Sequence, residues 1–161
     1  MPPTLRPLAA GDAPTCDAIV ASLPYHFGLE EGRRDCAAAV RSQRGIVAER
    51  DGEVIGFLTV EPRFDDAAEI TWMAVRADER RGGVGHALMD RLVADLEGEG
   101  RRVLLVLTVS PNEPPDEVDD GYQATRAFYA ANGFLLARDF AGYWGDHDTP
   151  VLMVRTLHRP D

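Results

Sequence analysis

The pattern of hydrophobic and polar positions along the chain predicts alternating strands and helices. Short apolar or alternating runs predict strands over Thr4 to Leu8, Gly45 to Arg50, Glu53 to Glu61, Ile70 to Val75, Arg102 to Val109, Phe134 to Asp139 and Val151 to Leu157. Helical spacing predicts helices over Ala13 to Leu23, Leu29 to Ser42, Val84 to Leu96 and Tyr122 to Asn132. This order predicts an α/β (α+β layered) fold, with a central mixed, mostly antiparallel sheet of about seven strands flanked by about four helices.

Local signals fix several of these boundaries. Asp51-Gly52 is a two-residue hairpin signal between two predicted strands. Asp12 is placed to cap the first helix, and Gly133 is a good residue to end the last one. We expect Pro62 to Ala67 to form a turn, and the apolar strand Arg102 to Val109 to be central and buried.

The stretch that organises the chain is an arginine- and glycine-rich turn, Arg80 to Gly85, between the strand ending at Val75 and the helix over Val84 to Leu96. A helix N-terminus presents N–H groups without partners, and glycine lets an anion approach them, so this turn predicts a phosphate site. Four residues, Arg76 to Glu79, separate strand from turn, which is too long for a dinucleotide fingerprint. The P-loop is excluded because no Gly-Lys-Ser/Thr occurs.

Length and composition bound the class of protein. With 161 residues and 17.6 kDa, a single domain over residues 1–161 is the natural expectation. We find neither a run of about 18 apolar residues nor a basic-then-apolar leader, so we expect no membrane association. Cys16 and Cys36 lack metal or redox spacing, which favours a reducing cytoplasm.

The net charge limits the classes of partner that the protein can be expected to bind. The net charge of −10 argues against a nucleic-acid partner and leaves cationic partners such as amines open. All 17 basic residues are arginine. The four histidines show no metal-ligand spacing, so we predict no metal. We also see no Gly-x-Ser-x-Gly elbow, and the chain therefore favours chemistry without an acyl-enzyme.

Several motifs together resemble those of one family. Arg80-Arg81-Gly82-Gly83-Val84-Gly85 is similar to the (Gln/Arg)-x-x-Gly-x-(Gly/Ala) signature of the GCN5-related N-acetyltransferase (GNAT) superfamily. Ala127 to Phe134 resembles that family's helix-to-strand "FYxxxGF" element. Met73-Ala74-Val75 looks like its strand end, Ala87-Leu88-Met89 like its helix start, and Gly56-Phe57 lies in the matching hairpin. The likeness covers essentially the whole chain.

The resemblance implies acetyl-CoA as cosubstrate, with no metal. In GNAT enzymes the cosubstrate lies between two central strands that part, its pantetheine paired with the fourth strand and its pyrophosphate on the glycine turn. Arg80, Arg81 and the helix N-terminus act at contact distance, whereas the net negative charge is screened over about 8 Å. By resemblance, the cofactor-binding residues are Met73, Ala74, Val75, Arg80, Arg81, Gly82, Gly83, Val84, Gly85 and His86.

The resemblance also assigns a catalytic acid. Tyr129 matches the tyrosine that commonly protonates the departing CoA thiolate. Helical spacing predicts a core stripe of Ala124, Phe128 and Ala131, with Tyr129 half-buried beside it and its hydroxyl usable. A packed, purely structural tyrosine is the alternative.

A protonated amine acceptor needs a base. An amine with a pKa of about 10.4 is almost wholly protonated near neutrality. Glu69 begins the central strand, at an offset from the glycine turn that resembles the catalytic glutamate of the histone-acetylating branch. The alternatives are that Glu69 is a solvated acid at the strand end or a substrate anchor. An ordered water could then be the base.

The chain departs from the family pattern in two places, and several aromatic residues are candidates for binding the acceptor. Tyr122 stands where the family often has asparagine, and Asn112 lies on the far side of the inserted acidic loop, within residues 110–121. We expect this loop to be solvated, and attraction of a cationic acceptor by its acidic residues is the alternative. Aromatic residues that suit an amine pocket are Tyr25, Phe27, Tyr143 and Trp144, accompanied by His26 and His147. We predict an N-acetyltransferase acting on a primary amine of a small molecule, peptide or protein. A non-catalytic acyl-CoA-binding module, another acyl-CoA and a hydroxyl acceptor stay open, as does a homodimer.

Overall fold

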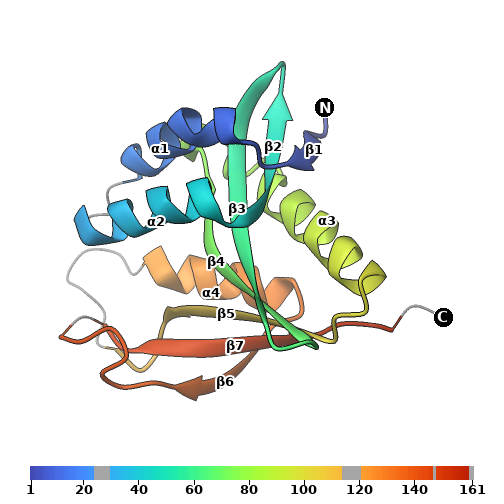
Figure 1. Cartoon of the computed structure of the whole chain (residues 1–161). Helices are drawn as coiled ribbons and strands as arrows, with labels where there is room; N and C mark the ends of the chain where they lie inside the picture. The colour runs from blue at the N-terminus through green and yellow to red at the C-terminus, as the bar shows by residue number, and fades with distance from the viewer. Residues whose placement is uncertain (24–29, 114–120, 147, 160–161) are drawn as a thin grey trace.

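A computed structural model of the chain describes residues 1–23, 30–113, 121–146 and 148–159 (Figure 1). One seven-stranded sheet has the order β1-β2-β3-β4-β5-β7-β6. The strands are β1 (Thr4–Pro7), β2 (Arg44–Arg50), β3 (Glu53–Arg63), β4 (Ala67–Val75), β5 (Val103–Val109), β6 (Leu135–Asp139) and β7 (Pro150–Thr156). The helices are α1 (Ala13–Ala21), α2 (Glu30–Ser42), α3 (Val84–Gly98) and α4 (Gly121–Ala131), with short 3-10 turns at Ala10–Asp12 and Ala77–Glu79. The predicted fold class is therefore confirmed.

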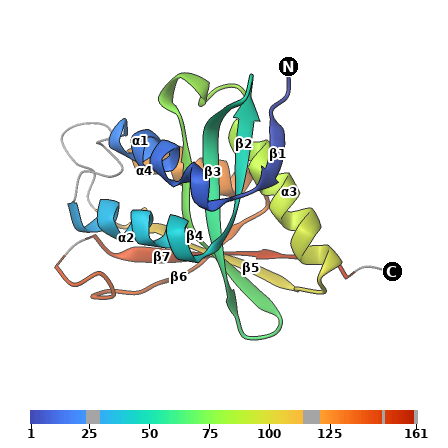
Figure 2. The same cartoon turned by 45° about the horizontal axis from the view of Figure 1, so that its top comes forward.

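The sheet separates into two parts at its centre. Among the described strands, only the pair β4–β5 is parallel, and its register runs from Ala67 with Val103 to Ile70 with Val106. Beyond Ile70 and Val106 the two strands part, so that their remaining residues are no longer paired with each other. Figures 1 and 2 show β4 and β5 running in different directions from the place where they meet.

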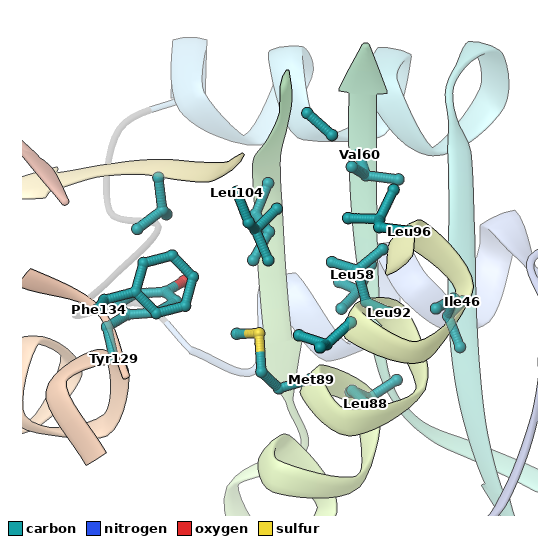
Figure 3. Close-up of a cluster of buried hydrophobic side chains, with 14 of the residues drawn as sticks. Ile46, Leu58, Val60, Leu88, Met89, Leu92, Leu96, Leu104, Tyr129 and Phe134 are labelled. Atoms are coloured by element: carbon teal, nitrogen blue, oxygen red, sulfur yellow. The ribbon is translucent and has the colours of Figure 1, made fainter. Parts of the chain in front are cut away.

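Two hydrophobic clusters hold helices on opposite faces of the sheet. One contains α1 and α2 residues packed on Phe57 of β3 and Ala74 of β4. The other contains the apolar side of α3, with Leu88, Met89 and Leu92 packed among β2, β3 and β5 side chains (Figure 3). The predicted apolar face of α3 is confirmed, and the start of this helix lies against the strand end at the centre of the sheet.

Most local signals behave as predicted. Asp51 and Gly52 adopt φ values of 53° and 79°, the left-handed pair that a tight hairpin requires, and Gly133 ends α4 with φ 87°. Cys16 and Cys36 are free and buried. No helix in the described part of the chain is long and apolar enough to span a membrane.

Three expectations need correction. Asp12 stands at the start of α1 but does not cap it, because its carboxylate instead accepts hydrogen bonds from Arg6 and from the Ala9 N–H. The Arg6 guanidinium holds the pKa of Asp12 below its usual range. Pro62 belongs to β3, so the turn is shorter than predicted. β5 is central, but most of its side chains alternate between buried and half-buried, so it is not buried throughout as predicted.

Candidate active site

The predicted anion site lies at the start of α3. Gly83 precedes the helix in the left-handed conformation, with φ 77°, and a Cβ built there would meet nothing within 4 Å. The first helical hydrogen bond runs from the Ala87 N–H to the Gly83 carbonyl, so the N–H groups before it have no partner within the helix. Gly82 differs, because its N–H donates to the Glu79 carbonyl. The turn therefore offers N–H groups from Gly83 to His86.

Positive charge surrounds these N–H groups. Arg80 and Arg81 are exposed, and neither forms an ion pair with another described residue. Arg50, by contrast, is committed to Glu79 beneath the turn. Two free cations beside a helix N-terminus favour an anion at contact distance.

The end of β4 presents backbone groups toward the place where the strands part. The Arg76 N–H donates to the Ile55 carbonyl of β3, and successive residues of a strand point their N–H and C=O groups to alternate sides. Met73 and Val75 therefore point theirs away from β3, where β5 no longer pairs with them. Ala74 points its groups to β3, so of the three predicted residues only Met73 and Val75 have backbone groups that are unpaired among the described residues.

A bulge in β4 accompanies this separation. Thr59 pairs with Trp72 and Val60 with Ile70, which leaves Thr71 as an extra residue. The Thr71 hydroxyl donates to Gln43, just after α2, and lies 2.7 Å from the Thr59 hydroxyl. Since Thr71 uses its proton on Gln43, Thr59 is the donor in the second bond. This hydrogen-bonded chain ties the bulge to β3 and α2, and the sequence pattern carried no signal for it.

The rings of α4 are arranged differently from the prediction. Tyr129 is only 6% exposed and packs edge-on against Phe134, beside Met89 and Leu104 (Figure 3). Ala124 and Ala131, predicted for the core stripe, are exposed. The prediction of a half-buried Tyr129 was wrong, because α4 turns this ring, rather than the alanines, toward the sheet.

Phe128 takes the position beside the glycine turn. A Cβ added to Gly85 would lie 2.9 Å from Phe128 Cε2 and 3.6 Å from Met73 Cε. The His86 and Phe128 ring centroids are 5.2 Å apart. Phe128 thus joins the start of α3 to α4, a contact that was not predicted from the sequence.

The buried hydroxyl of Tyr129 is chemically unusual. The Tyr129 hydroxyl makes no hydrogen bond to any other residue that the structure describes. Burial raises the pKa of the phenol above its ordinary value, so the group stays protonated through the neutral range. A buried polar group without a protein partner is uncommon, so this hydroxyl is a candidate for contact with a ligand or an ordered water.

Glu69 lies next to the point where the strands part, on the opposite face of the sheet. It pairs with Leu105 of β5 directly before the last pair, Ile70 with Val106. Ile70 is buried in the cluster that contains α3, so Glu69 points to the other face. Its Oε1 accepts from Arg63 Nε at 3.3 Å, and its side chain is 20% exposed.

The predicted acceptor residues are only partly described. Tyr25, His26, Phe27 and His147 lie outside the described residues, as does most of the acidic stretch. Tyr143 is 65% exposed and follows Phe140, whose ring centroid is 6.3 Å away, and Trp144 is half-buried. Asn112 donates to Asp139 at the end of β6. No group of three or more potential metal ligands occurs among the described residues.

Replacing Gly85 by alanine tests the contact between α3 and α4. Alanine is the better helix former by about 1 kcal/mol, but its Cβ would overlap the Phe128 ring. We expect Gly85→Ala to lower the free energy of unfolding by about 1–3 kcal/mol. Gly98→Ala, in the same helix with nothing within 4 Å of its Cβ, is the matched control and should be neutral or stabilising. Equal stability gains in both variants, measured by urea denaturation, would contradict this packing.

Comparison with known proteins places the chain among acetyltransferases. Residues 41–135 match the family model described as an acetyltransferase (GNAT) domain. A 63-residue segment is 40% identical to the amino-acid acetyltransferase of Azotobacter vinelandii, covering 38% of this chain and 15% of that protein. The chain thus spans a small part of the length of this curated relative.

Solved structures share the whole fold. A GNAT-family protein from Desulfovibrio desulfuricans superposes with a TM-score of 0.81 at 19% identity, over 97% of this chain and 99% of that one. The ribosomal-protein-S18-alanine N-acetyltransferase from Escherichia coli gives 0.76 at 20% identity, over 99% and 96%. A GNAT acetyltransferase from Elizabethkingia anophelis with acetyl-CoA bound gives 0.73 at 16% identity, over 96% and 98%.

Proposed function

Because the chain belongs to the GNAT superfamily of acetyltransferases, which use acetyl-CoA without a metal, we propose that it transfers an acetyl group from acetyl-CoA directly to a primary amine. The relatives support this class of acceptor, since one is named as an amino-acid acetyltransferase and another as a ribosomal-protein-alanine N-acetyltransferase. The acceptor is a small molecule, a peptide or a protein. The Tyr129 hydroxyl, which is buried and has no hydrogen-bond partner among the described residues, is the observation that carries the proposal.

The residues of the chain fit acetyl-CoA in three places. The N–H groups from Gly83 to His86 suit its pyrophosphate. Met73 and Val75 have backbone groups that no described residue pairs with, and these suit its pantetheine amides. Tyr129, on the same side of the sheet as α3, supplies a proton donor for its sulfur. Acetyl-CoA brings the acetyl group as a thioester.

The two catalytic groups lie on opposite faces of the sheet. An amine that approaches from the Glu69 face would lose a proton toward Glu69, directly or through water, and its nitrogen would bond to the acetyl carbon. The carbon–sulfur bond would then break, with the Tyr129 proton passing to sulfur. In this proposal the amine, coming from the Glu69 face, and the thioester, beside Tyr129 on the other face, meet at the place where β4 and β5 part. No residue of the protein needs to carry the acetyl group.

The role of Glu69 as base has its own test. We expect Glu69→Gln to lower kcat/KM about 10²–10³-fold near neutral pH, with part of the loss recovered at alkaline pH, where more of the amine is free. Glu61, opposite Glu69 and hydrogen-bonded to the same arginine, provides the matched control. Glu61→Gln should change kcat/KM less than threefold, roughly the scatter of exposed substitutions. Equal losses of kcat/KM in the two variants would mean that Glu69 acts only as an ion-pair partner of Arg63.

Binding and turnover test the function itself. Saturating acetyl-CoA, at about 100 times its Kd, should stabilise the protein by about 2.7 kcal/mol in a thermal-shift assay. A panel of amines, including free amino acids and peptide N-termini, is then assayed for thiol release, with product mass as readout. Stabilisation with no turnover on any acceptor would favour a non-catalytic acyl-CoA-binding module. A product of different mass would identify another acyl group or a hydroxyl acceptor.

A further inference from the structure

One face of β5 and β7 is apolar but lies outside both hydrophobic clusters. The two strands carry apolar side chains on both faces over most of their length, a pattern typical of strands that are covered on both sides. On one face Leu104, Val106 and Met153 are buried in the cluster that contains α3. On the other face the side chains are half-buried or exposed, and neither cluster of described residues includes them. We call these side chains the apolar surface: Leu105, Leu107, Leu152, Val154 and, on β6, Leu135.

The strand register connects the apolar surface to the candidate base. Glu69 of β4 pairs with Leu105 of β5. Leu105 pairs in turn with Val154 of β7, which pairs with Leu135 of β6. Paired residues point to the same face of a sheet, so these side chains form one row across four strands. Because neighbouring strands lie about 4.8 Å apart, the row extends about 14 Å from Glu69 to the edge of the sheet.

The two ends of the apolar surface carry opposite charge. At β4 the carboxylates of Glu61 and Glu69 share the single guanidinium of Arg63, so this end is net negative. At β6 the exposed Arg138 pairs with Leu152, which places a positive charge at the far end. A molecule with a cationic head and an apolar body is therefore favoured in one direction, with its head at Glu69.

We propose that the acceptor is a primary amine with an elongated hydrocarbon substituent, which lies along the apolar surface while its amino group reaches Glu69. This proposal rests on the proposed function, which supplies the transfer of the acetyl group, and the products are an N-alkylacetamide and CoA. The backbone groups of β5 and β7 bond within the sheet, so its face offers only aliphatic side chains. A peptide backbone there would lose its water without gaining partners, whereas a hydrocarbon chain would not. The observations therefore favour a lipophilic amine over a peptide.

A series of primary alkylamines measures the contribution of the apolar surface. A fully buried methylene group favours binding about fourfold, and a chain covered on one side should gain about half of that free energy, or about twofold per methylene. We expect kcat/KM to rise about 100-fold from propylamine to decylamine, mainly through a lower KM. The ratio of the two values, measured on one preparation, does not depend on the fraction of folded protein. Equal kcat/KM for the two amines would overturn the proposal.

Two neighbouring leucines of β6 provide a matched pair of variants. Leu135 and Leu136 are both exposed, but Leu136 pairs with Met153, on the face that is buried against α3. Leu135→Ser should lower the decylamine-to-propylamine ratio about fourfold, the equivalent of two methylene contacts. Leu136→Ser should keep the ratio within about twofold. Equal ratios in these two variants would remove the apolar surface from the acceptor site.

Methyl NMR follows binding without turnover. Decylamine should shift the signals of Leu105 and Leu152 and leave those of Leu88 and Leu92, which are buried in α3, unchanged. Acetylation of peptides but of neither alkylamine would overturn this proposal and leave the proposed function intact. So would a dimer that Leu135→Ser dissociates in sedimentation experiments, because a second copy would then cover the apolar surface. Absence of turnover on every amine would instead contradict the proposed function.

Discussion

Replacing Gly83 by glutamate should abolish acetyl-CoA binding, with a loss of affinity of at least about 100-fold, or roughly 2.7 kcal/mol. The open space around the Gly83 Cβ lies where the phosphate is expected, and a carboxylate there would meet the same N–H groups and arginines. It would both occupy the site and repel the pyrophosphate. Isothermal titration with acetyl-CoA measures the effect.

Two controls separate charge at the site from backbone strain. Gly83 has φ 77°, so any side chain there costs about 1–2 kcal/mol of stability. Gly83→Ala carries that strain without the charge and should bind acetyl-CoA several-fold more tightly than Gly83→Glu. Gly100→Glu, just after the other end of α3, has φ 82° and equally open surroundings, so it carries the same strain and charge. Unchanged affinity in Gly83→Glu, or equal loss in Gly100→Glu, would remove the turn from the binding site.

The elements that place this turn were predictable because their signals are local. Helix periodicity, the hairpin at Asp51-Gly52 and the helix end at Gly133 each depend on a few neighbouring residues, and all three are found in the structure. The turn between β4 and α3 is likewise defined by its own glycines. Such signals specify element boundaries without reference to the rest of the fold.

The details of the site depend on contacts between distant residues. In α4, spacing alone allows more than one apolar stripe, and the packing of Phe128 on Gly85 decides that Tyr129 is buried. The bulge at Thr71 depends on Gln43, far along the chain, and no local pattern marks it. Asn132 could be interpreted only as a residue before a helix-ending glycine, although its side chain binds His86. These features require the tertiary structure.

Replacing Tyr129 by phenylalanine should lower kcat about 10²–10⁴-fold, while leaving the Kd for acetyl-CoA unchanged. Phenylalanine keeps the ring that packs on Phe134 and removes only the hydroxyl. Because that hydroxyl is buried without a partner among the described residues, its loss should leave the melting temperature equal or higher. A large loss of turnover in an equally stable protein with intact binding would identify a proton donor to the sulfur.

The pH dependence of the rate gives a second test of Tyr129 as the proton donor. Burial raises the pKa of Tyr129, so the phenol stays protonated above the pH at which an ordinary tyrosine ionises. The wild-type rate should therefore show no alkaline loss near about pH 10 from this group. If Tyr129→Phe retained full kcat, Tyr129 would be a core residue only, and the proton for the leaving thiolate would have to come from elsewhere.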